Sequence, residues 1–178
     1  MKWRVLIIRN KKLLLSIGIV VIIIFFSIFG TPRYQSIKIK SEDFSDLENK
    51  LKDASNMNSE IDIKKLTNFD WDECYVFNPY YPSKAVYEKV GAEWTTANTF
   101  IGFLMFHNSE NETLNDDQFL IVFKKENTVV LVKRYSLSEL PIVFKLDNNR
   151  FTSNNAKFSS VISKQYNEDK IKELVLKK

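Results

Sequence analysis

The stretch "NFDWDECYVFNPYYPSKAVYEKVGAEW", residues 68–94, decides the fold. Between Trp71 and Phe77 it places aromatic and β-favouring residues on both alternating faces, a pattern typical of a central strand that is covered on both sides. Pro79 ends this strand, because proline has no N–H to donate to a sheet. We therefore expect Trp71, Tyr75 and Phe77 to belong to the hydrophobic core.

A short helix follows the strand. Ser83 is a suitable N-terminal cap, and Val86 and Val90 lie on one helical face. Gly91 then supplies the left-handed residue that commonly ends a helix. The sequence therefore predicts a helix that packs across the sheet.

Helices are also predicted at both ends of the folded part. Ser41 can cap an amphipathic helix over residues 42–54, in which Leu47 and Leu51 share one face. The last segment, residues 167–178, places apolar residues on one side and ends in lysines, which is typical of a terminal helix.

Five runs rich in Val, Ile, Leu and Phe are predicted strands, namely residues 99–107, 118–125, 128–135, 141–146 and 157–163. Glu126 and Asn127 join the second run to the third in a hairpin. The polar segments 108–117 and 147–155 are predicted loops. Strand runs bracketed by helices, without regular βαβ alternation, predict an α+β fold with one mostly antiparallel sheet and flanking helices.

An uncharged apolar run precedes this domain. Residues 13–30 span about 27 Å as a helix, enough to cross a bilayer. Residues 1–12 carry five Lys and Arg residues and no acid, which favours a cytoplasmic N-terminus and an extracytoplasmic domain. A cleavable signal peptide is the alternative, but Gly30 is the only small residue at the exit, after bulky Ile28 and Phe29. We therefore prefer an uncleaved single-pass anchor in the cell membrane.

The remaining chain divides simply. Pro32 and the lack of a sustained period predict a stalk over residues 31–40, which leaves residues 41–178 as one extracytoplasmic α+β domain. Five of the 26 Lys and Arg residues precede residue 31, so 21 remain against 22 acidic residues, a net charge of −1. A near-neutral domain lacks the basic stripe that nucleic-acid binding needs, and no nucleic-acid partner is expected.

One cysteine, Cys74, and one histidine, His107, limit the available chemistry. Cys74 lies in an apolar, strand-like run, a setting that raises a thiol pKa and makes the thiol inert. One Cys and one His cannot form a typical structural zinc site, and the four glycines are too isolated for a phosphate-binding loop. We therefore expect no cofactor and interpret His107 as a structural residue.

Asp70 and Asp72 are the remaining catalytic candidates. Two positions apart on a strand, they would share one face, where paired carboxylates can bind a cation or share a proton. A hard-cation site needs about six oxygen ligands, and the spacing that supplies them is missing around "DWDE". Structural roles are therefore favoured, and we predict no catalytic or metal-binding residue.

The central stretch also resembles the pattern F-D-W-D-x-x-Y-V-F-x-P-Y, followed by a short helix, Gly and Trp, of a family of small uncharacterised bacterial envelope proteins, many of them lipoproteins. The matching residues are Phe69, Asp70, Trp71, Asp72, Tyr75, Val76, Phe77, Pro79, Tyr80, Gly91 and Trp94. The resemblance extends over residues 61–145. It implies an extracytoplasmic bacterial protein with no established activity or cofactor. This chain differs in having an apolar helix where the lipoproteins have an acylated cysteine.

Two classes of function are open. The first is a non-enzymatic binding or envelope-accessory module tethered to the membrane, for example an immunity-type protein that neutralises a toxin there. The second is an envelope hydrolase that uses Asp70 or Asp72 as general base. The sequence offers no acid/base pair supported by a third group, and this favours binding.

The candidate partner surface is the pair Tyr80 and Tyr81. Prolines bracket both rings at the rim of the predicted sheet, with Trp94 expected behind them. Tyrosine can bury its ring at an interface while its hydroxyl stays hydrogen-bonded. The alternative for either residue is packing against the short helix.

Overall fold

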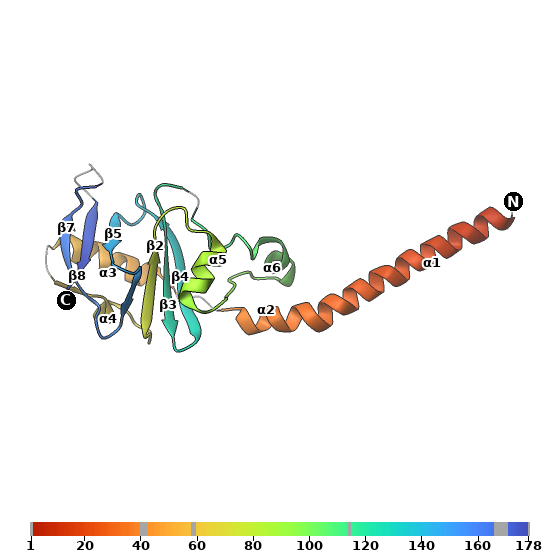
Figure 1. Ribbon diagram of the computed structural model, residues 1–178, viewed down its shortest axis with the longest axis horizontal. Coiled ribbons are helices and arrows are strands. Elements are labelled where there is room, and N and C mark those ends of the chain that lie inside the picture. Colours follow the sequence, from red (N-terminus) through yellow and green to blue (C-terminus); the bar gives the residue numbers. More distant parts are fainter. Residues whose placement is uncertain (1, 40–42, 58–59, 114, 166–170, 178) are drawn as a thin grey trace.

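The computed structural model describes residues 2–39, 43–57, 60–113, 115–165 and 171–177 (Figure 1). Within these residues, a long N-terminal helix leads into a folded part built from two four-stranded sheets and short helices. The helices are α1 (Lys2–Phe25), a π-helical turn (Phe26–Gly30), α2 (Thr31–Ile37), α3 (Ser45–Asn56), α4 (Ile63–Leu66), α5 (Ser83–Val90) and α6 (Phe100–Phe106). The strands are β1 (Glu60–Asp62), β2 (Glu73–Phe77), β3 (Gln118–Lys125), β4 (Thr128–Ser136), β5 (Ile142–Lys145), β6 (Arg150–Thr152), β7 (Lys157–Ile162) and β8 (Lys172–Leu176). The predicted α+β class is confirmed.

The strands form two sheets rather than the single predicted sheet. The first has the order β1-β7-β8-β5 and the second β4-β3-β2-β6. Among the described strands, every pair is antiparallel except β5 with β8. The expectation of mostly antiparallel pairing is confirmed, whereas the expectation of one sheet is wrong.

The C-terminal segment explains much of this difference, because the predicted helix over residues 167–178 is wrong. Its described part contains strand β8, which pairs with β7 on one edge and β5 on the other. Ile171 and Leu174 are buried, and backbone hydrogen bonds on both edges override the local helical spacing. Residues 166–170 and 178 lie outside the described residues.

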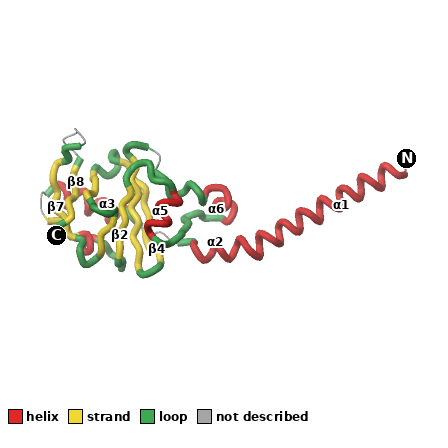
Figure 2. Tube along the Cα trace, viewed as in Figure 1, coloured by secondary structure: helices red, strands yellow, loops and turns green. Residues whose placement is uncertain are grey.

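Strand β2 lies between β3 and β6 in the second sheet. Figure 2 shows it with α3 on one side and α5 on the other. Cys74 and Val76 enter a hydrophobic cluster shared with the first sheet and α3, whereas Tyr75 and Phe77 enter a second cluster with α5. These four side chains are at most 4 % exposed. The prediction of a central strand covered on both sides is confirmed. Trp71, just before the strand, is also buried and belongs to the first cluster.

The helix after β2 is confirmed. α5 buries Val86 and Val90 in the second cluster, and Gly91 ends it with a φ of 70°. Only glycine adopts this left-handed conformation without strain. Ser83 does not cap the helix as expected, because its hydroxyl instead accepts the backbone N–H of Asn111 at 3.2 Å.

The amphipathic helix before the sheets is also confirmed as α3, with a later start. Leu47 and Leu51 are buried against the first cluster. The expected cap, Ser41, lies outside the described residues. The Asp43 carboxylate accepts the backbone N–H of Ser45 at 2.9 Å, and this hydrogen bond lowers the pKa of Asp43.

Residues 99–107 contain helix α6 instead of the predicted strand. Their apolar residues occupy nearly every position, so the pattern does not distinguish a strand from a helix. Thr99 favours the helix over the strand, because its hydroxyl oxygen accepts the N–H of Gly102 at 3.1 Å and caps the helix.

The connections are partly as expected. The hairpin of β3 and β4 is confirmed, and its turn places Glu126 at a φ of 52°. The predicted loop over residues 147–155 is partly wrong, because it contains β6, which pairs with β2. In the loop over residues 108–117, Asn111 and Thr113 are buried.

Residues 31–37, in the predicted stalk over residues 31–40, are helical, because α1 continues through the π-helical turn into α2 (Figure 1). Residue 40 lies outside the described residues. Pro32 stands in the first turn of α2, where a missing N–H costs little. The N–H of Thr31 donates to the carbonyl of Phe26, five residues back, which carries the helix past the proline. Among the described residues there is one candidate membrane span, Leu13–Ile37, which is long and apolar enough to cross a bilayer.

The end of this span is fastened to the folded part. Tyr34 is buried and its hydroxyl donates to the carbonyl of Ala97 at 2.8 Å. The N–H of Ile39 donates to the carbonyl of Thr95 at 3.0 Å, and the N–H of Thr95 donates to Ile37 at 2.9 Å. The span therefore joins the fold through packing and backbone pairing.

The packing of β2 generates a first prediction. Phe77 is fully buried between Tyr75 and Tyr81, with the Tyr81 ring centroid 5.0 Å away. Phe77→Ala should lower the free energy of unfolding by about 3 to 5 kcal/mol, because the lost ring leaves a cavity. Denaturant melts of the full chain in detergent measure this change. The control Val161→Ala, at a position that is 44 % exposed, should melt close to the wild type, and equal melts for the two variants would contradict the role of Phe77.

Candidate partner-binding surface

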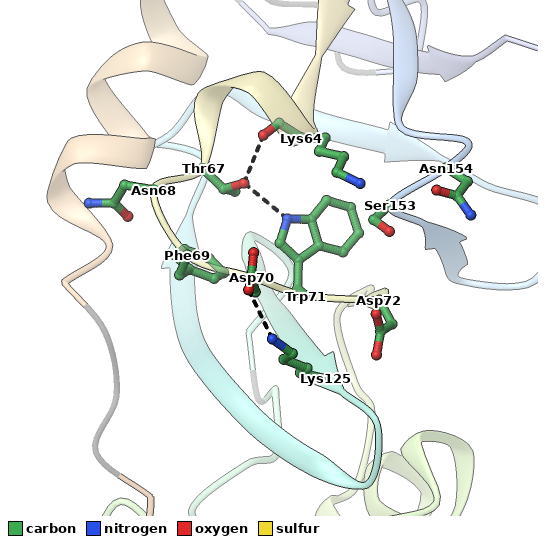
Figure 3. A pocket seen from close by; sticks show the side chains of 10 residues that line it. All are labelled: Lys64, Thr67, Asn68, Phe69, Asp70, Trp71, Asp72, Lys125, Ser153 and Asn154. Carbon is green, nitrogen blue, oxygen red and sulfur yellow. Dashed lines mark hydrogen bonds and ion pairs between the residues drawn. The ribbon is translucent and has the colours of Figure 1, made fainter.

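The segment before β2 forms one wall of a surface pocket of about 550 Å³ (Figure 3). Its lining is Lys64, Thr67, Asn68, Phe69, Asp70, Trp71, Asp72, Lys125, Ser153 and Asn154. The Trp71 indole N–H donates to the Thr67 hydroxyl at 3.0 Å, and that hydroxyl donates to the Lys64 carbonyl at 3.0 Å. This chain of bonds fixes the indole, and the lining around it is mainly polar.

Asp70 and Asp72 both line this pocket, but each is already engaged. Lys125 donates to Asp70 at 2.9 Å. This hydrogen bond and the charge of Lys125 lower the pKa of the Asp70 carboxyl, which makes Asp70 a weaker base. The ion pair thus favours the folded state at pH above the carboxyl's unfolded pKa, and its effect is lost as the pH falls through the lowered folded value.

Asp72 fastens three segments together. Its carboxylate accepts the N–H of Glu126 in the hairpin turn at 2.7 Å. Its backbone N–H donates to Lys124 and its carbonyl accepts from Ser153, both at 2.8 Å. These bonds give Asp72 a structural role at the end of the second sheet.

Cys74 and His107 lie on opposite faces of the second sheet. Cys74 is fully buried in the first cluster, and burial raises the pKa of its thiol well above the ordinary value. His107 follows α6 and stacks on Tyr87, which packs against the second cluster. The structure therefore does not bring the two side chains together as a nucleophile and base.

Tyr80 lies three residues after Phe77, the last residue of β2, at the opposite end of that strand from Asp70. It is 66 % exposed and has a φ of 64°, a strained conformation for a bulky residue. Its hydroxyl donates to the Asp116 carboxylate in the loop over residues 108–117. Asn78 and Pro79, just before it, line a second pocket of about 390 Å³ together with β5.

Tyr81 and Trp94 lie further inside. Tyr81 packs on Phe77, and its backbone N–H donates to the Thr113 hydroxyl at 2.8 Å. Trp94 is fully buried, with its indole N–H donating to Asn111 at 3.2 Å. Of the three predicted surface residues, Tyr80 is therefore the one with a largely exposed ring.

A polar pocket of about 450 Å³ beside the end of the span was missed by sequence reasoning. Arg33 and Glu93 pair there at 2.9 Å, and the Glu93 carboxylate lies 3.9 Å from His107. Glu110 lies 3.9 Å from the other side of the His107 ring. These residues are distant in sequence. The sequence therefore shows that each one can carry a charge, but not that they lie close together.

Within the described residues, no group of three or more His, Cys, Asp or Glu side chains is arranged to hold a metal ion. No family model matches the chain, and neither the curated proteins nor the solved structures contain a match.

Proposed function

We propose that the chain is a membrane-anchored extracytoplasmic binding module of the bacterial cell envelope. One observation carries this proposal: fourteen large apolar side chains between Leu13 and Phe29 are 41 % to 68 % exposed on a helix that points away from the fold (Figure 1). An exposed apolar surface of this length is strongly unfavourable in water and favourable in a bilayer. The resemblance to envelope proteins agrees with this location.

The orientation follows from charge. Five Lys and Arg residues and no acid precede residue 13. Short basic flanks stay on the cytoplasmic side, which directs the folded part to the outside. Figure 1 places the C-terminus on the side of the folded part away from α1, so a fusion there leaves the span undisturbed.

Binding is favoured over hydrolysis because the acidic candidates are engaged in the fold. Asp70 is paired with Lys125, and the carboxylate of Asp72 holds the hairpin turn. Tyr80, by contrast, keeps an exposed ring in a strained conformation, and such strain often marks a functional position. We propose Tyr80 as the centre of a protein-binding surface. An immunity-type protein that captures a toxin at the membrane is one example of this class.

The anchor is tested by topology. An enzymatic reporter fused after Lys178 should be active only outside the cytoplasm, and mass spectrometry should find the N-terminus retained. A variant with Gln in place of the five basic residues before residue 13 is the matched control, and its orientation should become mixed. A mature chain that begins near Thr31 would contradict the anchor.

The surface is tested by variants of Tyr80. Tyr80→Gly should keep the melting temperature, because relief of backbone strain offsets the lost hydrogen bond to Asp116, yet it should lose crosslinking to envelope partners. Tyr80→Phe should keep the crosslinking, because the ring remains, and should lower the melting temperature slightly, because the hydrogen bond to Asp116 is lost without relief of the backbone strain. Tyr81→Ala should lower the melting temperature, because its ring packs on Phe77. If Tyr80→Gly crosslinks to partners as the wild type does, Tyr80 does not belong to the partner surface.

A further inference from the structure

Helix α6 presents an apolar surface that the folded part does not cover. Its seven residues, FIGFLMF, carry no charge, and Phe103 is its only buried side chain. The exposed fractions are 68 % for Ile101, 49 % for Leu104, 68 % for Met105 and 58 % for Phe106. Four neighbouring large apolar side chains this exposed require a covering surface.

The same helix is packed against the membrane span. The Phe100 ring lies so close to Gly30 that a β-carbon there would stand 2.5 Å from the ring. The Phe100 ring centroid is 6.5 Å from that of Phe26 and 5.9 Å from that of Tyr34. α6 therefore begins where the uncharged run of the span ends.

This position sets the depth of α6 relative to a bilayer. The first charged residue after the apolar run is Arg33, three residues beyond Gly30, or about 4.5 Å along the helix. Arg33 is paired with Glu93 and belongs in the headgroup layer. Interfacial helices bury their apolar face about 5 to 10 Å into the boundary between headgroups and acyl chains, which is the level of Gly30.

The backbone around α6 is suited to a poorly hydrated layer. The Thr99 hydroxyl accepts the N–H of Gly102, and the N–H groups of Phe103 and His107 donate within the helix at 3.0 Å. Lys38, at the end of the span, donates to the carbonyl of Asn98 just before α6. Satisfied backbone groups reduce the cost of burial in lipid.

We propose that α6 is a second membrane contact, which inserts Ile101, Leu104, Met105 and Phe106 into the interfacial layer beside the span. This inference rests on the proposed insertion of the span. The contact would hold the folded part against the outer surface of the bilayer, with the polar pocket of Arg33, Glu93 and His107 at headgroup level.

Site-specific fluorescence quenching tests this contact in the full chain reconstituted into phosphatidylcholine and phosphatidylglycerol vesicles. In a Cys74→Ala background, an environment-sensitive probe is attached to Met105→Cys, Met57→Cys or Val21→Cys. Met57 is the matched control, because it is 72 % exposed and directly follows α3, a helix on the side of the fold away from α1 (Figure 1). Lipids that carry a nitroxide at a shallow or a deep acyl position serve as quenchers.

The probe at Met105 should shift its emission to the blue and lose intensity with the shallow quencher. The probe at Val21 should lose intensity with the deep quencher. The probe at Met57 should respond to neither quencher. Quenching at Val21 without quenching at Met105 would overturn the role of α6 and leave the anchor intact. A blue shift at Met105 without quenching would also overturn it, in favour of a covering protein or second copy. Absence of quenching at Val21 would overturn the anchor and this contact with it.

Two glycine variants test the geometry. Gly30→Ala places a methyl group against the Phe100 ring and should reduce the quenching at Met105, because α6 must move off the span. Gly18→Ala, which meets no atom within 4 Å, should leave the quenching unchanged. If the two variants are quenched equally, the packing of Phe100 on Gly30 does not set the depth of α6 in the bilayer.

Discussion

Strand β2 must bury side chains on both faces while its backbone is hydrogen-bonded on both edges, and the positions of the other elements follow from this constraint. Cys74 and Val76 require the first sheet and α3 on one side, and Tyr75 and Phe77 require α5 on the other. Both candidate surfaces lie at the ends of this strand. The pocket around Trp71 precedes it and Tyr80 follows it, so neither surface depends on a free loop for its position.

The attachment of the span to the folded part is a second constraint on the structure. Tyr34 is buried in the fold, and Ile37 and Ile39 exchange backbone hydrogen bonds with Thr95. These contacts replace the stalk that the sequence predicted. They connect the helix, the segment before α6 and the end of α5 in one packed unit. If the span is inserted in a bilayer as proposed, these contacts would hold Tyr80 at a fixed height above the membrane surface.

The sequence predicted the elements whose local signals agree with their packing. Proline and glycine marked the end of β2 and of α5, alternation marked β2, and a tight turn marked the hairpin of β3 and β4. It failed where the local pattern was ambiguous. The uncharged run of α6 suited a strand or a helix, and β8 has helical spacing that pairing with two strands overrides. The sequence predicted exposure for the pair Tyr80 and Tyr81 without distinguishing between them. The backbone strain at Tyr80 and the polar pocket at Arg33 depend on contacts between distant segments and could not be predicted.

The central claim is that the span and the folded part form one rigid unit. The most direct measurement is the distance distribution between spin labels at Val20→Cys in the span and Lys84→Cys on α5, recorded by pulsed electron paramagnetic resonance on the full chain in lipid nanodiscs. Cys74 is buried and does not compete for the label. A single narrow distance distribution, unchanged between detergent and lipid, is expected. A broad distribution, as a flexible stalk over residues 31–40 would give, would contradict it.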